Sequence, residues 1–319
     1  MLKRILGRSQ VEVSALGLGC MQIGGCCWRN GKWSGFEVDD HESTRAIHWA
    51  LDHGVNLLDT ADAYGCGHSE QVVGKALTGR RHEVVIATKF GNTFDEKSRV
   101  RKGPDARPEY IRRACEASLR RLGTDVIDLY QFHSQTFDID RAPEVRDVLE
   151  ELVSAGKIRW YGWSTDDPDR ARVFAQGPHC AAVQQELNLF RGNRDTLRLC
   201  EQLSLASINR RPLAFGVLAG KFHSEVRLPE HDPRSSWDFR SGDVAERVRA
   251  VERFRSVLAS DGRTLVQGVF GWIWAMSDVT IPIPGFRTLA QVQENVGALE
   301  HGPLSDEQMA EVARLQGTA

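Results

Sequence analysis

Short apolar runs alternate along the chain with longer amphipathic stretches. The runs have the length and composition of buried strands, and the stretches have the 3.6-residue period of helices with one apolar face. The predicted strands cover residues 15–20, 55–59, 83–89, 126–133, 158–164, 181–186, 205–210 and 279–282. The predicted helices that follow them cover residues 42–53, 70–77, 108–122, 142–155, 168–174, 195–202, 265–276 and 289–299.

The pattern therefore contains eight strand–helix units. Repeated units of this kind predict an α/β protein with a parallel sheet and right-handed crossovers, and eight of them predict closure into a (β/α)8 TIM barrel. An open, doubly wound sheet is the alternative. We expect a β-hairpin over residues 2–13, and an inserted loop after strand 7 over residues 211–263 with a helix near 244–258. No linker divides the chain, so residues 1–319 are predicted to form a single domain.

Composition narrows the class of protein. The chain has 41 basic and 43 acidic residues, and a net charge of −2 lacks the basic character of a nucleic-acid-binding protein. No apolar run approaches the length of about 18 residues that a membrane-spanning helix needs. With 41% hydrophobic and 26% charged residues, the sequence is typical of a globular protein in water.

The cysteines and histidines add two expectations. The seven cysteines are odd in number and form no CxxC motif, which is typical of reduced thiols in the cytoplasm. The first residues, Met1-Leu2-Lys3-Arg4-Ile5, do not resemble a signal peptide, so we expect a cytoplasmic protein. The ten histidines include no HExxH motif, and no metal site is expected.

Four polar residues lie at or just after the ends of predicted strands. Asp59 and Tyr64 follow strand 2, Lys89 ends strand 3, and His133 ends strand 4. A single residue of this kind is often a helix cap or a core polar group, but the four share the rim where barrel enzymes carry their chemistry. An ammonium group beside a phenol lowers its pKa, and a carboxylate keeps that ammonium charged. The set therefore predicts general-acid catalysis at a carbonyl oxygen.

Several segments resemble the aldo-keto reductase superfamily along nearly the whole chain. They cover residues 54–65, 69–70, 74–77, 88–89, 118–122, 128–133, 156–159, 282–288 and 294–295. The resemblance implies a barrel that binds a nicotinamide cofactor, with Asp59, Tyr64, Lys89 and His133 as the catalytic tetrad. Tyr64 would be the acid in reduction and the base in oxidation, Lys89 would tune it, and His133 would orient the carbonyl. Hydride would pass from nicotinamide C4 to the carbonyl carbon.

The cofactor site is expected outside any Rossmann motif. The nearest match, Gly17-Leu18-Gly19-Cys20-Met21-Gln22, has Gln at the sixth position and no helix directly after it. The resemblance instead implies cofactor contacts at Gly19, Met21, Asp59, Ser164, Gln184, Arg210, Pro212, Leu213, Gly216, Leu218, Lys221, Gly285, Arg287, Gln291, Glu294 and Asn295. The guanidinium of Arg287 suits a 2′-phosphate, which favours NADPH/NADP over NADH.

Two positions depart from the family's pattern. Thr165 stands where many members have Asn, and Arg210 stands where many members stack a Tyr on the nicotinamide. An arginine plane stacks on a neutral ring but is repelled by a cationic one. We therefore expect tighter binding of NADPH than of NADP⁺.

Aromatic residues in the predicted loops are candidates for the substrate pocket. Trp28 and Trp33, in the loop after strand 1, are expected to form a wall near Tyr64 and His133, with Trp163 and Trp237 as further rim candidates. Ordinary loop packing is the alternative. The predicted function is NADPH-dependent reduction of aldehydes or ketones. The alternatives are an NADP-dependent alcohol or aldose dehydrogenase, a cofactor-sensing binding subunit and, more weakly, a metal-dependent hydrolase.

Overall fold

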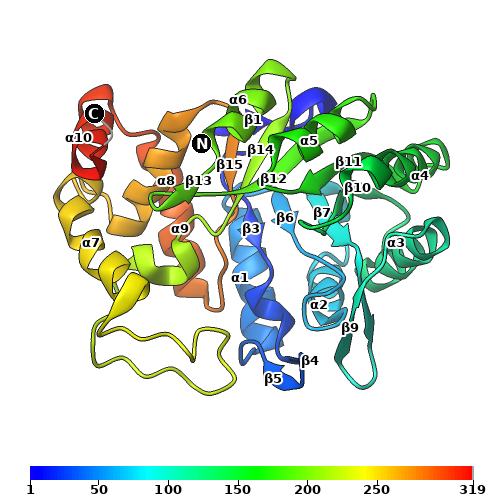
Figure 1. The fold of residues 1–319 in the computed structure, drawn as a ribbon, viewed down its shortest axis with the longest axis horizontal. Helices are drawn as coiled ribbons and strands as arrows, with labels where there is room; N and C mark the ends of the chain where they lie inside the picture. Colours follow the sequence, from blue (N-terminus) through cyan, green and yellow to red (C-terminus); the bar gives the residue numbers. More distant parts are fainter. Residues whose placement is uncertain (318–319) are drawn as a thin grey trace.

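Eight parallel strands form the centre of the structure, a computed structural model that describes residues 1–317 (Figure 1). In spatial order they are β3 (Leu18–Gly19), β6 (Leu57–Asp59), β7 (Val85–Phe90), β10 (Ile127–Phe132), β11 (Ile158–Ser164), β12 (Cys180–Asn188), β14 (Ala206–Arg210) and β15 (Thr280–Pro282). The first and last strands also meet, because the amides of Gly17 and Gly19 donate to the carbonyls of Pro282 and Pro284 at 3.0 and 2.9 Å. The predicted (β/α)8 barrel is confirmed.

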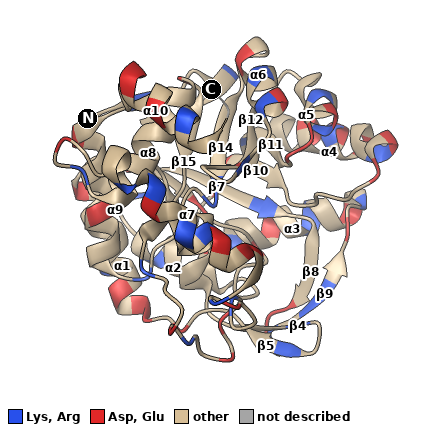
Figure 2. Cartoon of the chain, turned by 60° about the vertical axis from the view of Figure 1, so that its left-hand side comes forward, with Lys and Arg blue, Asp and Glu red and all other residues tan. Residues whose placement is uncertain are grey.

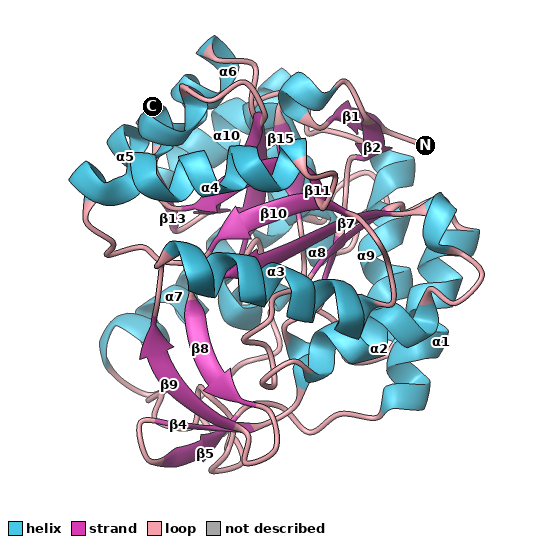
Figure 3. Ribbon diagram, turned by 90° about the vertical axis from the view of Figure 1, so that its right-hand side faces the viewer, coloured by secondary structure: helices cyan, strands magenta, loops and turns pink. Residues whose placement is uncertain are grey.

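One helix follows each barrel strand and packs on the outside of the sheet (Figure 3). These helices are α1 (Asp40–Asp52), α2 (His68–Ala76), α3 (Pro108–Leu122), α4 (Ala142–Ser154), α5 (Pro168–Ala175), α6 (Arg194–Gln202), α8 (Leu265–Met276) and α9 (Leu289–His301). Their starts follow from local sequence: Asp39 caps α1 with its carboxylate, and Thr264 and Gln267 form a capping box on α8.

The barrel strands are buried on both faces, which explains their continuous apolar runs. All residues of β7, β10 and β12 are buried. Trp163 belongs to this core and not to the rim where the sequence placed it. Its ring packs against Phe174, and its indole N–H donates to the carbonyl of Ser134 at 2.7 Å.

The predicted N-terminal hairpin is present, with β1 (Lys3–Ile5) and β2 (Glu12–Ser14) paired antiparallel. It lies against the end of the barrel where the strands begin. At Gly7, with φ of +50°, a Cβ would lie 2.1 Å from the carbonyl oxygen of Ala181. Glycine is therefore required by both backbone conformation and close approach.

Several elements were not predicted. A second sheet, here called the cap sheet, consists of β4 (Cys27–Arg29), β5 (Lys32–Ser34), β8 (Asn92–Asp95) and β9 (Val100–Pro104). Figure 3 shows it projecting from one side of the barrel. It joins the loops after β3 and β7. The short strand β13 (Arg191–Gly192) and the last helix, α10 (Asp306–Gln316), were also missed.

The insert after β14 contains the predicted helix as α7 (Gly242–Leu258), preceded by the 3₁₀ segment η5 (Ala214–Ala219). Helix α7 packs with α8 and α10 around a separate apolar cluster that includes Phe254, Trp272 and Val312. Within residues 1–317, no helix combines the length and the apolar character needed to cross a bilayer.

Candidate active site

A chain of hydrogen bonds links three of the predicted catalytic residues. The Lys89 ammonium donates to the Asp59 carboxylate at 2.5 Å, to the Thr60 carbonyl at 2.7 Å and to the Tyr64 hydroxyl at 3.4 Å. The ends of β6 and β7 supply Asp59 and Lys89, and the loop before α2 supplies Tyr64. Lys89 is completely buried and Asp59 is nearly so. The structure therefore brings the charged pair and the phenol together at one rim.

Two glutamines hold the second oxygen of Asp59. Gln184 of β12 donates to it at 2.7 Å, and Gln131 of β10 donates at 3.1 Å. Gln184 also donates to the amide oxygen of Gln131 at 3.2 Å. Because each carboxylate oxygen has its own donors, Asp59 is fixed in the orientation that pairs it with Lys89. The sequence placed Gln184 against the cofactor, and its amide N–H is instead committed to Asp59.

The protonation states follow from burial and from the neighbouring charges. Burial alone lowers the pKa of Lys89, but Asp59 and Tyr64 outweigh it and raise that pKa overall. Burial raises the pKa of Tyr64, and the nearby Lys89 offsets this only in part. Lys89 thus lowers the tyrosine pKa as expected, and burial outweighs this effect in the protein without ligand. At neutral pH Lys89 is charged and Tyr64 is a protonated phenol, ready to donate its proton.

His133 lies beside Tyr64. The two rings meet edge to face with centroids 5.9 Å apart, and the His133 amide donates to the Phe90 carbonyl at 2.7 Å. Burial holds the pKa of His133 well below its usual range, and the positive charges of Lys89 and Arg101 lower it further. The imidazole is therefore neutral at neutral pH. Its Nδ1 is buried without a partner among the described residues.

Other buried polar atoms near the strand ends also lack partners in the described structure. They include the Ser164 hydroxyl at the end of β11 and the Asn295 amide nitrogen in α9. Such groups are rare in folded proteins and call for a bound polar partner. Both belong to the set that the resemblance assigns to the cofactor, so this chain fits a nicotinamide dinucleotide at the carboxamide end and at the adenosine end.

The segment after β14 contains the other expected cofactor contacts. It turns tightly because Phe215 and Gly216 have φ of 58° and 91°, and the Leu213 carbonyl accepts from the amides of Gly216 and Leu218 at 2.8 and 3.2 Å. Lys221 follows, 68% exposed and 4.0 Å from Glu294 of α9.

Two further positions of that set lie on the β15–α9 side of the rim. Gly285 forms a bridge with Gly19 across the barrel seam. Arg287 is exposed, and its backbone amide donates to Gln291 at 2.8 Å. Together with Lys221, this arrangement leaves two exposed cations on one side of the rim.

Arg210 does not take the position that the sequence analysis gave it. Its guanidinium forms ion pairs with Asp166 and with Glu186, the latter at 3.2 Å, and the side chain is only 12% exposed. Glu186 also pairs with Arg211 at 2.9 Å. The two carboxylates oppose the positive charge, so the predicted discrimination against an oxidised nicotinamide loses its electrostatic basis. Sequence reasoning did not single out Asp166.

Trp28 and Trp33 pair across β4 and β5 with ring centroids 5.7 Å apart, and they are 45% and 40% exposed. Their neighbour Cys27 is buried, and its thiol is hydrogen-bonded to Cys66 in the loop of Tyr64. Because adjacent strand residues face opposite sides, the indoles lie on the face of the cap sheet away from that loop. They do not form the expected wall beside Tyr64.

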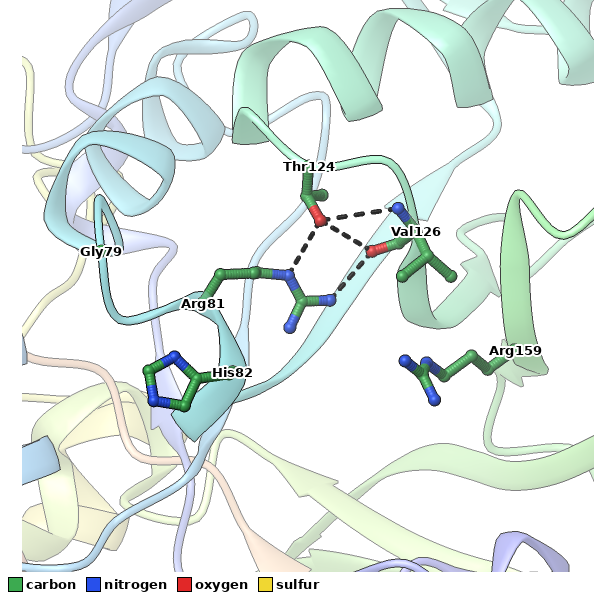
Figure 4. A pocket seen from close by; sticks show the side chains of 6 residues that line it. All are labelled: Gly79, Arg81, His82, Thr124, Val126 and Arg159. Atoms are coloured by element: carbon green, nitrogen blue, oxygen red, sulfur yellow. Dashed lines mark hydrogen bonds between the residues drawn. The ribbon is translucent and has the colours of Figure 1, made fainter.

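Two other hollows carry less chemistry. One lies at the opposite end of the barrel, where Arg81 donates to Thr124 and to the carbonyl of Val126 (Figure 4). The other, about 220 Å³, lies between α7 and the segment after β14. Glu186 and Arg211 of the rim line it, and its Arg247 is paired with Asp243. The polar groups in both are largely satisfied within the protein. No group of three or more potential metal-binding side chains occurs in the part of the chain that the structure describes.

Comparison with known proteins adds independent findings. Residues 15–316 match the model of the Aldo/keto reductase family. The chain is 30% identical over 311 residues to the uncharacterized oxidoreductase YqkF of Bacillus subtilis, covering 97% of this chain and 94% of the relative.

Two solved structures are similar to this one. The glycerol dehydrogenase AKR11B4 from Gluconobacter oxydans has a TM-score of 0.83 and 32% identity, covering 96% of this chain and 92% of its own. An aldo-keto reductase from Klebsiella pneumoniae in complex with NADPH has a TM-score of 0.72 and 28% identity. The match covers 100% of this chain and 97% of the Klebsiella chain.

Proposed function

The chain belongs to the aldo/keto reductase family, and from this premise we propose that it reduces aldehyde and ketone carbonyls with Tyr64 as the general acid. The observation that carries the proposal is the buried hydrogen-bond chain from Asp59 through Lys89 to Tyr64. The protein is an NADP-dependent oxidoreductase, and its individual substrate is the open question.

The proposed mechanism follows from the states of the side chains. Tyr64, a neutral phenol held by Lys89, donates its proton to the carbonyl oxygen as negative charge develops there. The Lys89 ammonium stabilises the phenolate that remains, and Asp59 keeps the ammonium charged and in place. His133, neutral and edge-on to Tyr64, donates a hydrogen bond that orients the same oxygen. When bound, the reduced nicotinamide supplies the hydride.

The residues proposed to hold the cofactor lie along the part of the rim that runs from β11 to β15. Ser164 and the carbonyl oxygen of Gln184 would contact the carboxamide. The segment 212–221 would contact the pyrophosphate, and Arg287 would contact the 2′-phosphate. The similar Klebsiella protein binds NADPH, and the exposed guanidinium of Arg287 supports the same choice here. Asn295 would hold the adenosine through its unpartnered amide.

Oxidation of an alcohol is a second candidate activity for the same site. The similar Gluconobacter protein is named a glycerol dehydrogenase, which favours this direction. Tyr64 would then accept a proton, and the Lys89 ammonium would favour the phenolate that does so. The direction depends on the substrate and on the cofactor ratio, since one site catalyses both.

The deciding experiment follows NADPH absorbance at 340 nm with a panel of aldehydes and ketones. Tyr64→Phe should lower kcat by about 10²–10⁴-fold, the usual contribution of general acid–base catalysis, while NADPH binds as in wild type. The matched control is Tyr161→Phe, which removes a buried hydroxyl hydrogen-bonded to Glu150, away from the rim.

Each outcome of that assay has a defined meaning. Equal loss in both variants, or none in either, would overturn the assignment of Tyr64. Tight NADPH binding without turnover in either direction would instead favour a cofactor-sensing subunit. Preference for NADH would overturn the role of Arg287.

We also propose that the protein works in the cytoplasm. All seven cysteines are free thiols buried in the fold, and such usage is typical of a reducing compartment. Fractionation of cells that produce the tagged protein would test this.

A further inference from the structure

Among the described residues, three arginines of the cap sheet form no ion pair with a carboxylate. Arg29 lies in β4, and Arg99 and Arg101 lie in or beside β9. Within residues 1–317, none of the three forms an ion pair or a side-chain hydrogen bond, although the structure contains many Arg–carboxylate pairs elsewhere. Figure 2 shows basic residues on β9 and β5 of this sheet. Arg29 is exposed, whereas Arg99 and Arg101 are half-buried. A half-buried guanidinium without a carboxylate partner is costly and calls for an anion.

The cap sheet turns these arginines toward the active site. Trp28 of β4 pairs in parallel register with Val100 of β9, so Arg29 and Arg101 lie side by side, each one residue further along. Exposure alternates along β9: Val100 is exposed and Arg101 is half-buried. Arg101 thus shares the face of Cys27, whose thiol contacts Cys66, two residues after Tyr64.

The field of Arg101 reaches the catalytic residues. It contributes to the lowered pKa of His133, after burial and Lys89. Arg29 in turn has its pKa lowered by burial first and then by the positive charges of Arg101 and Arg211. Arg29 therefore lies close to two other positive charges that repel it. A bound anion would relieve this repulsion.

The charged residues around Lys89 and around Arg210 are already paired. Asp59 pairs with Lys89, and Asp166 and Glu186 pair with Arg210 and Arg211. The unpaired positive charge at the rim therefore comes from the cap sheet on one side and from the exposed Arg287 on the other. Its loops follow β3 and β7, whereas the residues proposed for the cofactor phosphates, Lys221 and Arg287, follow β14 and β15.

We propose that Arg101, assisted by Arg29, binds an anionic group of the substrate, so that the preferred substrates are aldehydes or ketones that carry a carboxylate or similar anion. This inference rests on the proposed function and names its substrate class. The planar guanidinium accepts a carboxylate in a bidentate geometry. Tyr64 and His133 would hold the carbonyl end, and the arginine pair would hold the opposite end.

The test compares two substrates of similar size that differ in charge: 4-carboxybenzaldehyde and its neutral methyl ester, methyl 4-formylbenzoate. We expect wild type to prefer the carboxylate in kcat/KM. Arg101→Gln should reduce this preference by about tenfold or more, the usual effect of losing a hydrogen bond to a charged group. The ester should be turned over at the wild-type rate, which separates this inference from a failure of the proposed function.

The matched control is Lys102→Gln, which removes the same charge from the next residue of β9, on the exposed face. It should leave the carboxylate preference unchanged. An equal fall in both variants would mean general attraction by net charge and would overturn the assignment of Arg101.

A second readout does not depend on turnover. Binding of the product 4-(hydroxymethyl)benzoate to the enzyme–NADP⁺ complex, measured by calorimetry, should weaken by a similar factor in Arg101→Gln only. Unchanged product affinity would overturn the proposal. Weaker NADPH binding in the same variant would show that Arg101 serves the cofactor and would overturn it as well.

Discussion

At the scale of single residues, burial decides the chemistry of the site. Lys89 has no exposed surface, and it keeps its charge because Asp59 lies 2.5 Å away. Tyr64 keeps its proton because burial outweighs the attraction of that same ammonium for a phenolate. The residue types predict an acid and a tuning cation, but only their depth in the barrel sets the direction in which each pKa moves.

The pKa of the Cys27 thiol depends on the positive charges of the cap sheet. The hydrogen bond from Cys66, together with the positive charges of Arg101 and Arg29, lowers the pKa of Cys27 to about 6 against the effect of burial. The other six cysteines have raised pKa values, for which burial is the main cause at five and the hydrogen bond to Cys27 at Cys66. Cys27 is thus the thiol with the largest thiolate fraction near neutral pH.

We therefore predict that iodoacetamide modifies Cys27 first, as read by mass spectrometry after brief exposure. The rate should rise as the pH increases through about 6 and then level off, because the thiolate is the reactive form. Arg101→Gln should move this midpoint to higher pH, and Lys102→Gln should move it less. A midpoint near that of a free cysteine, or first modification at another cysteine, would contradict the prediction.

At the scale of elements, a close contact between two turns positions the loop of Tyr64. The 3₁₀ turn at Gln22–Gly24 lies directly against the backbone after Tyr64. A Cβ at Gly65, where φ is +59°, would lie 1.7 Å from the carbonyl oxygen of Gly24. The loop after β3 therefore packs against the loop that carries Tyr64. The backbone of Gly24 leaves no room for a side chain at position 65.

Gly65→Ala should lower the free energy of unfolding by about 2–5 kcal/mol, since overpacking and left-handed backbone strain both apply. It should also lower kcat, because relief of the contact displaces Tyr64. Gly79→Ala is the control, with φ of +80° and no atom within 4 Å of its added Cβ. It should cost only about 1–2 kcal/mol of strain and leave kcat unchanged. Urea unfolding and steady-state rates measure both effects, and equal losses would refute the role given to the contact.

At the scale of the whole molecule, the ring of strands joins distant parts of the sequence. Gly17 and Gly19 bond to residues 282 and 284, so the barrel is complete only when both ends of the chain have folded. Trp274 of α8 also donates to the carbonyl of Ala15 at 2.8 Å. These contacts support the proposal that residues 1–319 form a single domain.

The prediction at this scale is one cooperative unfolding transition. Tryptophan fluorescence and far-ultraviolet circular dichroism should give the same midpoint in urea. NADPH at 100 times its Kd should raise the free energy of unfolding by about 2.7 kcal/mol and move both curves together. Separate midpoints, or a shift in one curve only, would show that α7 of the insert and the last helix, α10, fold together as an independent unit.

The sequence by itself determined the barrel and brought together the four residues proposed for catalysis. Hydrophobic periodicity is local, so it marked each strand–helix unit, and parallel strands in a barrel bring all their carboxyl ends to one rim. That is why Asp59, Tyr64, Lys89 and His133 were predicted together. The cap sheet escaped this reasoning because its strands are short and polar, and their partners lie far apart in the sequence.

Only the tertiary structure decided which charges have partners. Arg210 and Arg101 look alike in the sequence, yet Arg210 lies between Asp166 and Glu186, while Arg101 is half-buried and has no ion pair among the described residues. The tertiary structure also decided the direction of Trp28. Adjacent residues of a strand face opposite sides of the sheet, and Trp28 lies on the side away from the rim. Burial and pairing depend on distances between separate elements, and these distances are set when the barrel closes rather than by local sequence.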